Sequence, residues 1–212
     1  MPADEVVVVR LPSTAAALWP ALATAGRGLT GAARVVVLRG ETADFFSDSA
    51  QPAPDAPGPG ESVQWLRRHD VITIAVVTGR AAGAGFALAM ACDLRLVADD
   101  AEFAVPGGDR RSWEPVEGIE RLVDALGYAQ SLELALTGRA LSGREAAALG
   151  LVNHAVPPGG LEAALGELVG AALATPRTAA TLTKAMLAAS GEDRLRRMDE
   201  VAAAFRLSEG EL

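Results

Sequence analysis

Half of the 212 residues are apolar, which is enough to bury one sizeable core, so we expect a single domain with a C-terminal extension. The net charge of −8 repels a phosphate backbone and excludes nucleic-acid binding in the absence of a local basic stripe, which the sequence lacks. The apolar runs are too short to span a bilayer, the acidic N-terminus does not resemble a secretion signal, and a single cysteine suits a reducing compartment, so we predict a cytoplasmic protein.

Four runs rich in β-branched residues predict strands that are covered on both faces, at residues 5–11, 33–38, 71–77 and 94–98. Between the first two, leucines at helical spacing predict a helix that begins near Ser13 or Thr14 and ends near Gly26 or Gly28. A second helix is expected over residues 83–92. The alternation of strands and helices indicates an α/β core with crossover connections.

The segment before the third strand is rich in proline. We expect residues 51–61 to form a loop, because proline fits neither the interior of a helix nor a central strand. A short helix is predicted after it, at residues 62–70.

From Ile119 onward we expect the strands to stop, apart from a short extended piece at residues 151–157. The spacing predicts a helix over 118–138 that is interrupted at Gly127. Ser142 and Glu145 form a capping-box pattern at the start of a short helix that Gly150 closes. Further helices are predicted at residues 161–174, 177–190 and 193–208.

Residues 79–85, GRAAGAG, follow a predicted strand and open a predicted helix with almost no side chains. A ligand can lie directly against such a backbone, where the first helical turn leaves N–H groups without partners and a partial positive charge. These groups would polarise a carbonyl oxygen and stabilise an enolate oxygen still more, as one half of an oxyanion hole. The other N–H is expected from the loop DFFSDSA, residues 44–50. Tight packing of strand and helix without any ligand is the alternative explanation.

Other ligand classes are disfavoured. No Gly-Lys-Ser/Thr follows the glycine-rich run, and its spacing does not match a dinucleotide-binding fingerprint. One cysteine excludes a thiolate cluster, and two histidines far apart argue against zinc, so we expect no metal. We expect Cys92 to be buried and unreactive, and Asp93 to end a helix rather than to catalyse.

Three stretches together resemble the crotonase superfamily, also called enoyl-CoA hydratase/isomerase. They are RVVVLRGETADFFSDSA (34–50), VITIAVVTGRAAGAGFALAMACDLRLVADDAEFAVP (71–106) and LALTGRALSGREAAALGLVNHAVP (134–157). The resemblance covers almost the whole chain and implies an α/β fold, a spiral of ββα units followed by C-terminal helices, usually assembled as trimers or dimers of trimers. We accordingly divide the chain into a crotonase-like core, residues 1–155, and a C-terminal helical trimerisation or lid region, residues 156–212.

The resemblance also implies a coenzyme A thioester as ligand, with coenzyme A as part of the substrate and no permanently bound cofactor. The two oxyanion-hole amides fall on Ala50 and Ala84. The residues expected to contact the substrate are Phe46, Ala82, Gly83, Asp109 and Trp113. The candidates for the coenzyme's phosphates are Arg10, Arg67 and Arg80, although a solvated surface charge is the commoner role for each.

Hydratases of this family move protons with two glutamates, and these positions fall on Ala87 and Gly107, neither of which can carry a proton. A standard two-glutamate hydratase is therefore not expected. Glu114 and Glu117 follow in the stretch where some branches of the family carry a working carboxylate, and desolvation beside an aromatic side chain would suit such a group to acid/base work. The alternative is that both acids only favour the N-terminus of the next helix.

We therefore predict an acyl-CoA enzyme that stabilises a thioester enolate, in an isomerisation, dehydration, decarboxylation or retro-Claisen step run by Glu114 or Glu117. Two alternatives stay open. One is a non-catalytic acyl-CoA-binding or accessory protein, and the other is a scaffold that binds no ligand.

Overall fold

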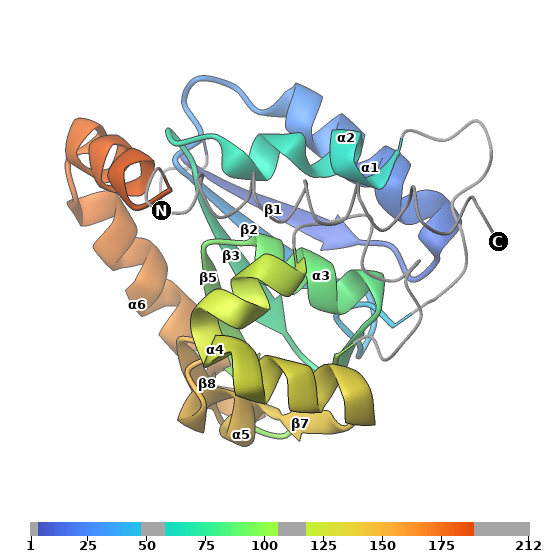
Figure 1. Ribbon diagram of the computed structural model, residues 1–212. Helices are drawn as coiled ribbons and strands as arrows, with labels where there is room; N and C mark the ends of the chain where they lie inside the picture. The colour runs from blue at the N-terminus through green and yellow to red at the C-terminus, as the bar shows by residue number, and fades with distance from the viewer. Residues whose placement is uncertain (1–3, 48–57, 106–117, 189–212) are drawn as a thin grey trace, which may run out of the picture.

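The computed structural model describes residues 4–47, 58–105 and 118–188 (Figure 1). Its centre is a parallel sheet in the order β1-β2-β3-β5-β8. These strands are β1 (Val6–Leu11), β2 (Val35–Gly40), β3 (Ile72–Val77), β5 (Leu94–Ala98) and β8 (His154–Val156). A second sheet, in the order β4-β6-β7, consists of β4 (Arg80–Ala82), β6 (Glu102–Ala104) and β7 (Ala140–Ser142). The α/β prediction is confirmed.

Helices surround the parallel sheet. In Figure 1, α1 and α2 lie above the sheet, and α6 runs along its left side. The helices are α1 (Ala15–Gly28), α2 (Pro59–Val63), the 3₁₀ helix η1 (Gln64–Arg67), α3 (Ala84–Ala91), α4 (Gly118–Thr137), α5 (Gly143–Ala148), the 3₁₀ helix η3 (Pro158–Gly160) and α6 (Leu161–Ala174). Residues 177–188 form the last described helix.

The core lies on both faces of the parallel sheet. Residues 35–38 of β2 and 73–77 of β3 are buried without alternation, as expected for parallel strands covered by helices on each side. α1 contributes Leu18, Trp19 and Leu22 to this core, and α6 contributes Leu161 and Val169. The nearly continuous β-branched runs of the sequence therefore predict this arrangement correctly.

The strands of the second sheet are missing from the sequence-based prediction. β4, β6 and β7 are three residues long, too short to carry a detectable periodicity. The expectation that strands stop at Ile119 is wrong for β7, which pairs antiparallel with β6 and places Leu141 opposite Phe103. The extended piece expected at residues 151–157 is confirmed as β8.

The proline-rich segment ends earlier than predicted. We expected a loop through residue 61, but α2 begins at Pro59. A helix tolerates proline at its first position, because an N–H group there would have no acceptor within the helix. The helix predicted over residues 62–70 instead continues α2 as η1 and ends at Arg67. Residues 48–57 lie outside the described part of the chain.

Two predicted helix boundaries are confirmed. α4 is broken at Gly127, whose φ of 75° and ψ of 169° are not helical. The capping box at the start of α5 is formed, because the Glu145 N–H donates to Ser142 Oγ (3.2 Å) and the Ser142 N–H donates to Glu145 Oε2 (2.8 Å). The Glu145 carboxylate accepts from the Ser142 N–H and also from the Ser142 Oγ (2.8 Å), and these two hydrogen bonds, the backbone one first, hold the pKa of Glu145 below its usual value.

Replacing Ser142 with Ala is expected to lower the free energy of unfolding by about 1 kcal/mol at neutral pH, as measured by urea denaturation. Since the pKa of Glu145 is lowered in the folded protein, the stabilisation by its carboxylate is present above the ordinary pKa and is lost as the pH falls through the lowered one. The difference between wild type and Ser142→Ala should therefore shrink below about pH 4. If the difference in unfolding free energy between wild type and Ser142→Ala is the same at neutral pH as below about pH 4, the role of the carboxylate is contradicted.

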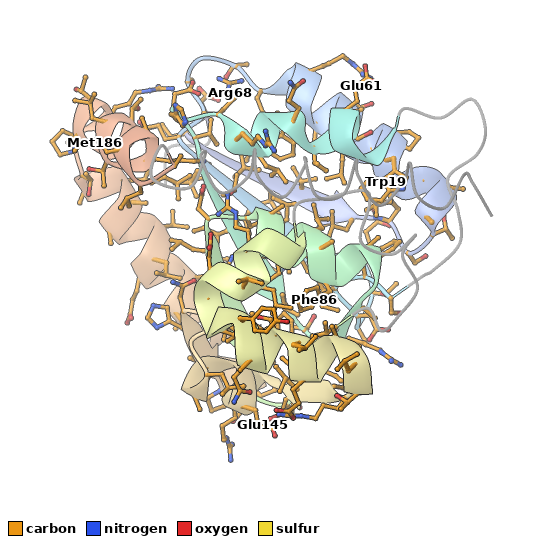
Figure 2. The ribbon with its side chains drawn as sticks, viewed as in Figure 1. Trp19, Glu61, Arg68, Phe86, Glu145 and Met186 are labelled. Atoms are coloured by element: carbon orange, nitrogen blue, oxygen red, sulfur yellow. The ribbon has the colours of Figure 1, made fainter. Side chains whose placement is uncertain are left out.

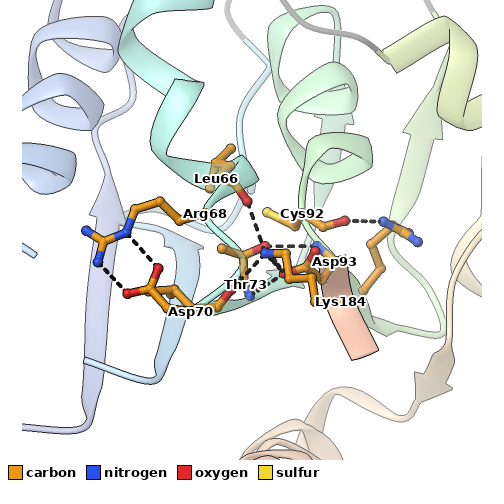
Figure 3. A network of polar contacts seen from close by, with 9 residues as sticks. Leu66, Arg68, Asp70, Thr73, Cys92, Asp93 and Lys184 are labelled. Carbon is orange, nitrogen blue, oxygen red and sulfur yellow. Dashed lines mark hydrogen bonds and ion pairs between the residues drawn. The ribbon is translucent and has the colours of Figure 1, made fainter. Parts of the chain in front are cut away.

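Lys184 attaches the last described helix to the amino ends of β3 and β5 (Figure 3). Its Nζ donates to Asp93 Oδ2 (2.7 Å), to the Val71 carbonyl (2.7 Å) and to the Leu66 carbonyl (3.2 Å). The same carboxylate oxygen accepts from the N–H and the Oγ1 of Thr73, both at 2.8 Å. Asp93, which we expected only to end a helix, thus joins three elements of the fold.

Arg34 holds the end of α6 at the same edge of the sheet. Its guanidinium donates to the carbonyls of Leu173 (3.0 Å), Ala172 (3.3 Å) and Thr175. A cation at the C-terminus of a helix interacts favourably with the helix dipole. Both C-terminal helices are therefore fastened to the parallel sheet, and the boundary predicted at residue 155 falls inside β8. The trimerisation or lid role of residues 156–212 stays a prediction.

Candidate functional site

α3 begins at Ala84, immediately after a tight turn at Gly83. Gly83 has a φ of 52° and a ψ of −118°, a conformation that glycine adopts without a steric penalty. The N–H of Ala84, as the first residue of the helix, has no acceptor within α3. Ala82, Gly83 and Ala84 are all half-buried. The predicted helix start is confirmed, and it places a backbone donor at the positive end of the helix dipole.

The direction of α3 is fixed by packing on all sides. Residues 85–90, which include Phe86 (Figure 2), are buried. The Phe86 ring lies edge-on against Phe103, with ring centroids 6.5 Å apart. Ala87, at the position that resembles the first hydratase glutamate, is 1% exposed and lies in the apolar core. This helix therefore supplies a rigid backbone donor and no acid/base group at that position.

The loop after β2 is bound along the turn that leads into α3. The N–H of Phe45 donates to the Thr78 carbonyl (2.9 Å), and the N–H of Phe46 donates to the Arg80 carbonyl (3.2 Å). The N–H of Ala82 donates in return to the Phe46 carbonyl (3.0 Å). The segment that leads to Ala50 thus runs beside the segment that leads to Ala84, as far as Ser47, where the described part of the loop ends.

Two glycines make this close approach possible. A Cβ added at Gly85 would lie 2.0 Å from the Phe46 carbonyl oxygen, and one added at Gly79 would lie 2.5 Å from the Ala43 carbonyl oxygen. Gly79 also has a φ of 53°. The small residues of the GRAAGAG run therefore serve backbone contact between two loops, in addition to opening the helix.

Asp44 is a residue that the sequence analysis missed. Its Oδ1 accepts the N–H of Arg80 (2.9 Å), and its Oδ2 accepts the Oγ–H of Ser47 (3.0 Å). A single aspartate in a short loop is common in turns, so its position alone gives no functional signal. A possible signal is Gly79, because a glycine directly after a buried strand indicates that another backbone approaches there.

Several predicted site residues lie outside the described residues. They are Ala50, Asp109, Trp113, Glu114 and Glu117, together with Gly107. The meeting of the Ala50 and Ala84 amides, and the place of the carboxylates, stay predictions. Phe46 is described, and its side chain is buried in the core.

The three predicted phosphate-binding arginines do not lie together. Arg10 lies near the carboxyl end of β1, and Arg80 follows the carboxyl end of β3 as the first residue of β4; both are exposed. Arg80 forms an ion pair with Glu102 at 3.3 Å. Arg67 ends η1 before the start of β3, so it lies at the opposite end of that strand from Arg80.

Cys92 ends α3 and is fully buried. Burial, foremost, raises the pKa of its thiol to about 12, so the thiol stays neutral and has no nucleophilic character at neutral pH. Among the described residues, no group of three or more His, Cys, Asp or Glu side chains could hold a metal ion. Within the same part of the chain, no helix is long and apolar enough to cross a bilayer.

Comparison with known proteins gives consistent matches. The model of the enoyl-CoA hydratase/isomerase family matches residues 56–206. A Thermobifida fusca protein described as an enoyl-CoA hydratase, solved in complex with acetoacetyl-CoA, superposes with a TM-score of 0.77 at 32% identity and covers 95% of this chain and 92% of its own. The expected crotonase fold is confirmed.

Curated relatives match over shorter segments. Human enoyl-CoA hydratase domain-containing protein 2, mitochondrial, is 49% identical over 84 residues, which are 40% of this chain and 29% of that protein. Hydroxycinnamoyl-CoA hydratase-lyase of Pseudomonas fluorescens is 38% identical over 104 residues, which are 46% of this chain and 37% of that protein. The chain thus matches about a third of the length of these relatives.

Proposed function

Because the chain belongs to the enoyl-CoA hydratase/isomerase family, we propose that it binds a coenzyme A thioester and stabilises the enolate of its acyl group. The thioester oxygen accepts the N–H groups of Ala84 and Ala50. The observation that carries this proposal is the docking of the loop of residues 41–47 against β4, directly beside the first turn of α3. A rigid, buried helix that aims its N–H groups at developing negative charge is an effective electrostatic catalyst.

In the proposed reaction, a carboxylate removes or returns a proton next to the thioester carbonyl. The negative charge that develops moves onto the carbonyl oxygen, where the two amides stabilise it more strongly than they stabilise the uncharged carbonyl. Ala87 cannot take part as a base, so we assign this role to Glu114 or Glu117. Phe46, Ala82, Gly83, Asp109 and Trp113 are proposed to surround the acyl group.

Coenzyme A recognition is proposed at the carboxyl edge of the sheet. Arg10 and Arg80 are its candidates, because both lie at this edge and are exposed to solvent. Arg67 lies at the other end of β3 from Arg80, and its role as a third candidate stays a prediction. The T. fusca protein solved with acetoacetyl-CoA supports this ligand class. We further propose a cytoplasmic trimer or dimer of trimers, although the human relative is named mitochondrial.

A second candidate function is binding of acyl-CoA without catalysis. It is favoured by Ala87, since an apolar, buried residue stands where the family's hydratases carry a glutamate. This candidate retains the amide donors and predicts affinity for thioesters with no turnover.

Glu114→Gln and Glu117→Gln, made separately, distinguish the two candidates. We expect one of them to slow turnover of enoyl-CoA substrates by on the order of 100-fold, with little change in ligand affinity. Ligand binding is followed by the thermal shift, and acyl-CoA at 100 times its Kd should stabilise the protein by about 2.7 kcal/mol. Binding without turnover in the wild type favours the non-catalytic candidate. No thermal shift at any acyl-CoA concentration would exclude both.

A further inference from the structure

We propose that Asp44 is a positioning residue, which holds the two segments that carry the oxyanion-hole amides in register. This inference rests on the proposed function. The Asp44 carboxylate joins the two segments directly. One of its oxygens accepts a hydrogen bond from the Arg80 N–H at 2.9 Å, and the other accepts one from the Ser47 hydroxyl at 3.0 Å. Arg80 and Ser47 precede Ala84 and Ala50, respectively, by only a few residues.

The backbone contacts alone leave the outgoing end of the loop without a described anchor. They fix Phe45 and Phe46 against Thr78, Arg80 and Ala82. Beyond Phe46, in the part of the loop that the structure describes, the hydrogen bond from Ser47 to Asp44 fixes the last described residue before the segment that continues to Ala50. Hydrogen bonds to an ionised carboxylate are shorter and stronger than those between neutral groups, so this contact is well suited to set a direction.

Two glycines leave space for Asp44. A Cβ at Gly79 would lie 2.5 Å from Asp44 Oδ1, so glycine at that position leaves the space that the carboxylate occupies. Gly40, at the end of β2, leaves space for the Asp44 carbonyl oxygen, since a Cβ there would lie 2.0 Å from it. Asp44 is therefore packed between two glycines, with its backbone held on one side and its side chain on the other.

The charge of Asp44 acts against the reaction, whereas its hydrogen bonds favour it. A carboxylate close to a developing enolate repels the enolate's charge, and the guanidinium of Arg80 is engaged with Glu102 at 3.3 Å. Asp44→Asn separates the two effects, because the amide keeps an acceptor for the Arg80 N–H and can donate to the Ser47 hydroxyl but carries no charge. Asp44→Ala removes both effects.

The test uses acetoacetyl-CoA as the probe on the full chain, and needs no turnover. The conjugated enolate of this ligand absorbs in the near ultraviolet, at longer wavelengths than the thioester and the adenine ring of the keto form, so the spectrum at saturation reports how strongly the site stabilises an enolate oxygen. Asp44→Ala is expected to lower the enolate-to-keto ratio about tenfold, below the ~100-fold effect of removing a whole oxyanion donor. Asp44→Asn is expected to retain or raise the wild-type ratio. Asp70→Ala, which breaks an ion pair with Arg68 at the other end of β3, is the matched control and should leave the ratio unchanged.

The outcomes separate this inference from the proposed function. Wild-type protein that binds acetoacetyl-CoA without enriching the enolate overturns the oxyanion hole itself. A wild-type ratio that Asp44→Ala leaves unchanged overturns the role of Asp44 alone, as does a loss in Asp44→Asn equal to that in Asp44→Ala. Circular dichroism verifies the fold of each variant. Should Asp44→Ala fail to fold, Ser47→Ala carries the test, and an unchanged ratio there overturns the inference.

Discussion

Replacing Gly85 with Ala is expected to abolish enolate stabilisation, lowering the enolate-to-keto ratio of bound acetoacetyl-CoA by on the order of 100-fold or more. The new Cβ would lie 2.0 Å from the Phe46 carbonyl oxygen, so the loop and α3 must move apart. The Cβ is fixed to the backbone of α3, and the Phe46 oxygen belongs to backbone that is hydrogen-bonded to β4, so neither atom can turn away as the end of a flexible side chain could. The hydrogen bond from Ala82 to Phe46 should be lost as well, with a cost in stability of about 1–3 kcal/mol.

Gly166→Ala is the matched control for that variant. Gly166 is exposed in the interior of α6, and a Cβ there meets nothing within 4 Å. Alanine in a helix interior is favoured over glycine, so this variant should gain up to about 1 kcal/mol and bind the ligand unchanged. Similar urea midpoints for Gly85→Ala and Gly166→Ala would show that the Cβ at position 85 does not push the loop and α3 apart.

Lys184→Met should destabilise the protein by about 3 kcal/mol, the low end for loss of one partner of a buried ion pair. The side chains of Lys184 and Asp93 are 14% and 19% exposed, so the remaining carboxylate would be left largely desolvated. The carbonyls of Leu66 and Val71 would lose their donor at the same time. Urea denaturation at neutral pH measures the change.

A surface ion pair supplies the comparison for Lys184→Met. Arg144 contacts Asp99 at 2.8 Å, but its side chain is 80% exposed, so Arg144→Met should cost less than about 1 kcal/mol. Asp93→Asn combined with Lys184→Met should cost less than the sum of the single changes, because the two residues act as a pair. Strict additivity would refute the coupling.

The sequence predicts features that depend on neighbouring residues. The break at Gly127, the capping box of Ser142 and the start of α3 each follow from a few consecutive side chains, and all three are confirmed. The buried strands are equally predictable, because continuous β-branched runs have no polar face to place in water.

The contacts that the sequence does not reveal join distant segments. Lys184 and Asp93 are separated by 91 positions, and nothing around either residue indicates the other. Asp44 and Arg80 are 36 positions apart, and their contact involves a backbone N–H that every residue except proline possesses. The short strands β4, β6 and β7 form because α3 and the core hold them together, and not because of their own propensity.

The pairing of β5 with β8 has a consequence for synthesis of the chain. β1, β2, β3 and β5 pair in the order in which they leave the ribosome, but the edge of β5 receives its neighbour only after another 58 residues, when Asn153 bonds to Arg95. During that interval the growing polypeptide carries an apolar strand with unpaired N–H and C=O groups along one side. Such an edge recruits other chains, so aggregation of nascent molecules should begin here, before translation of β8 is complete.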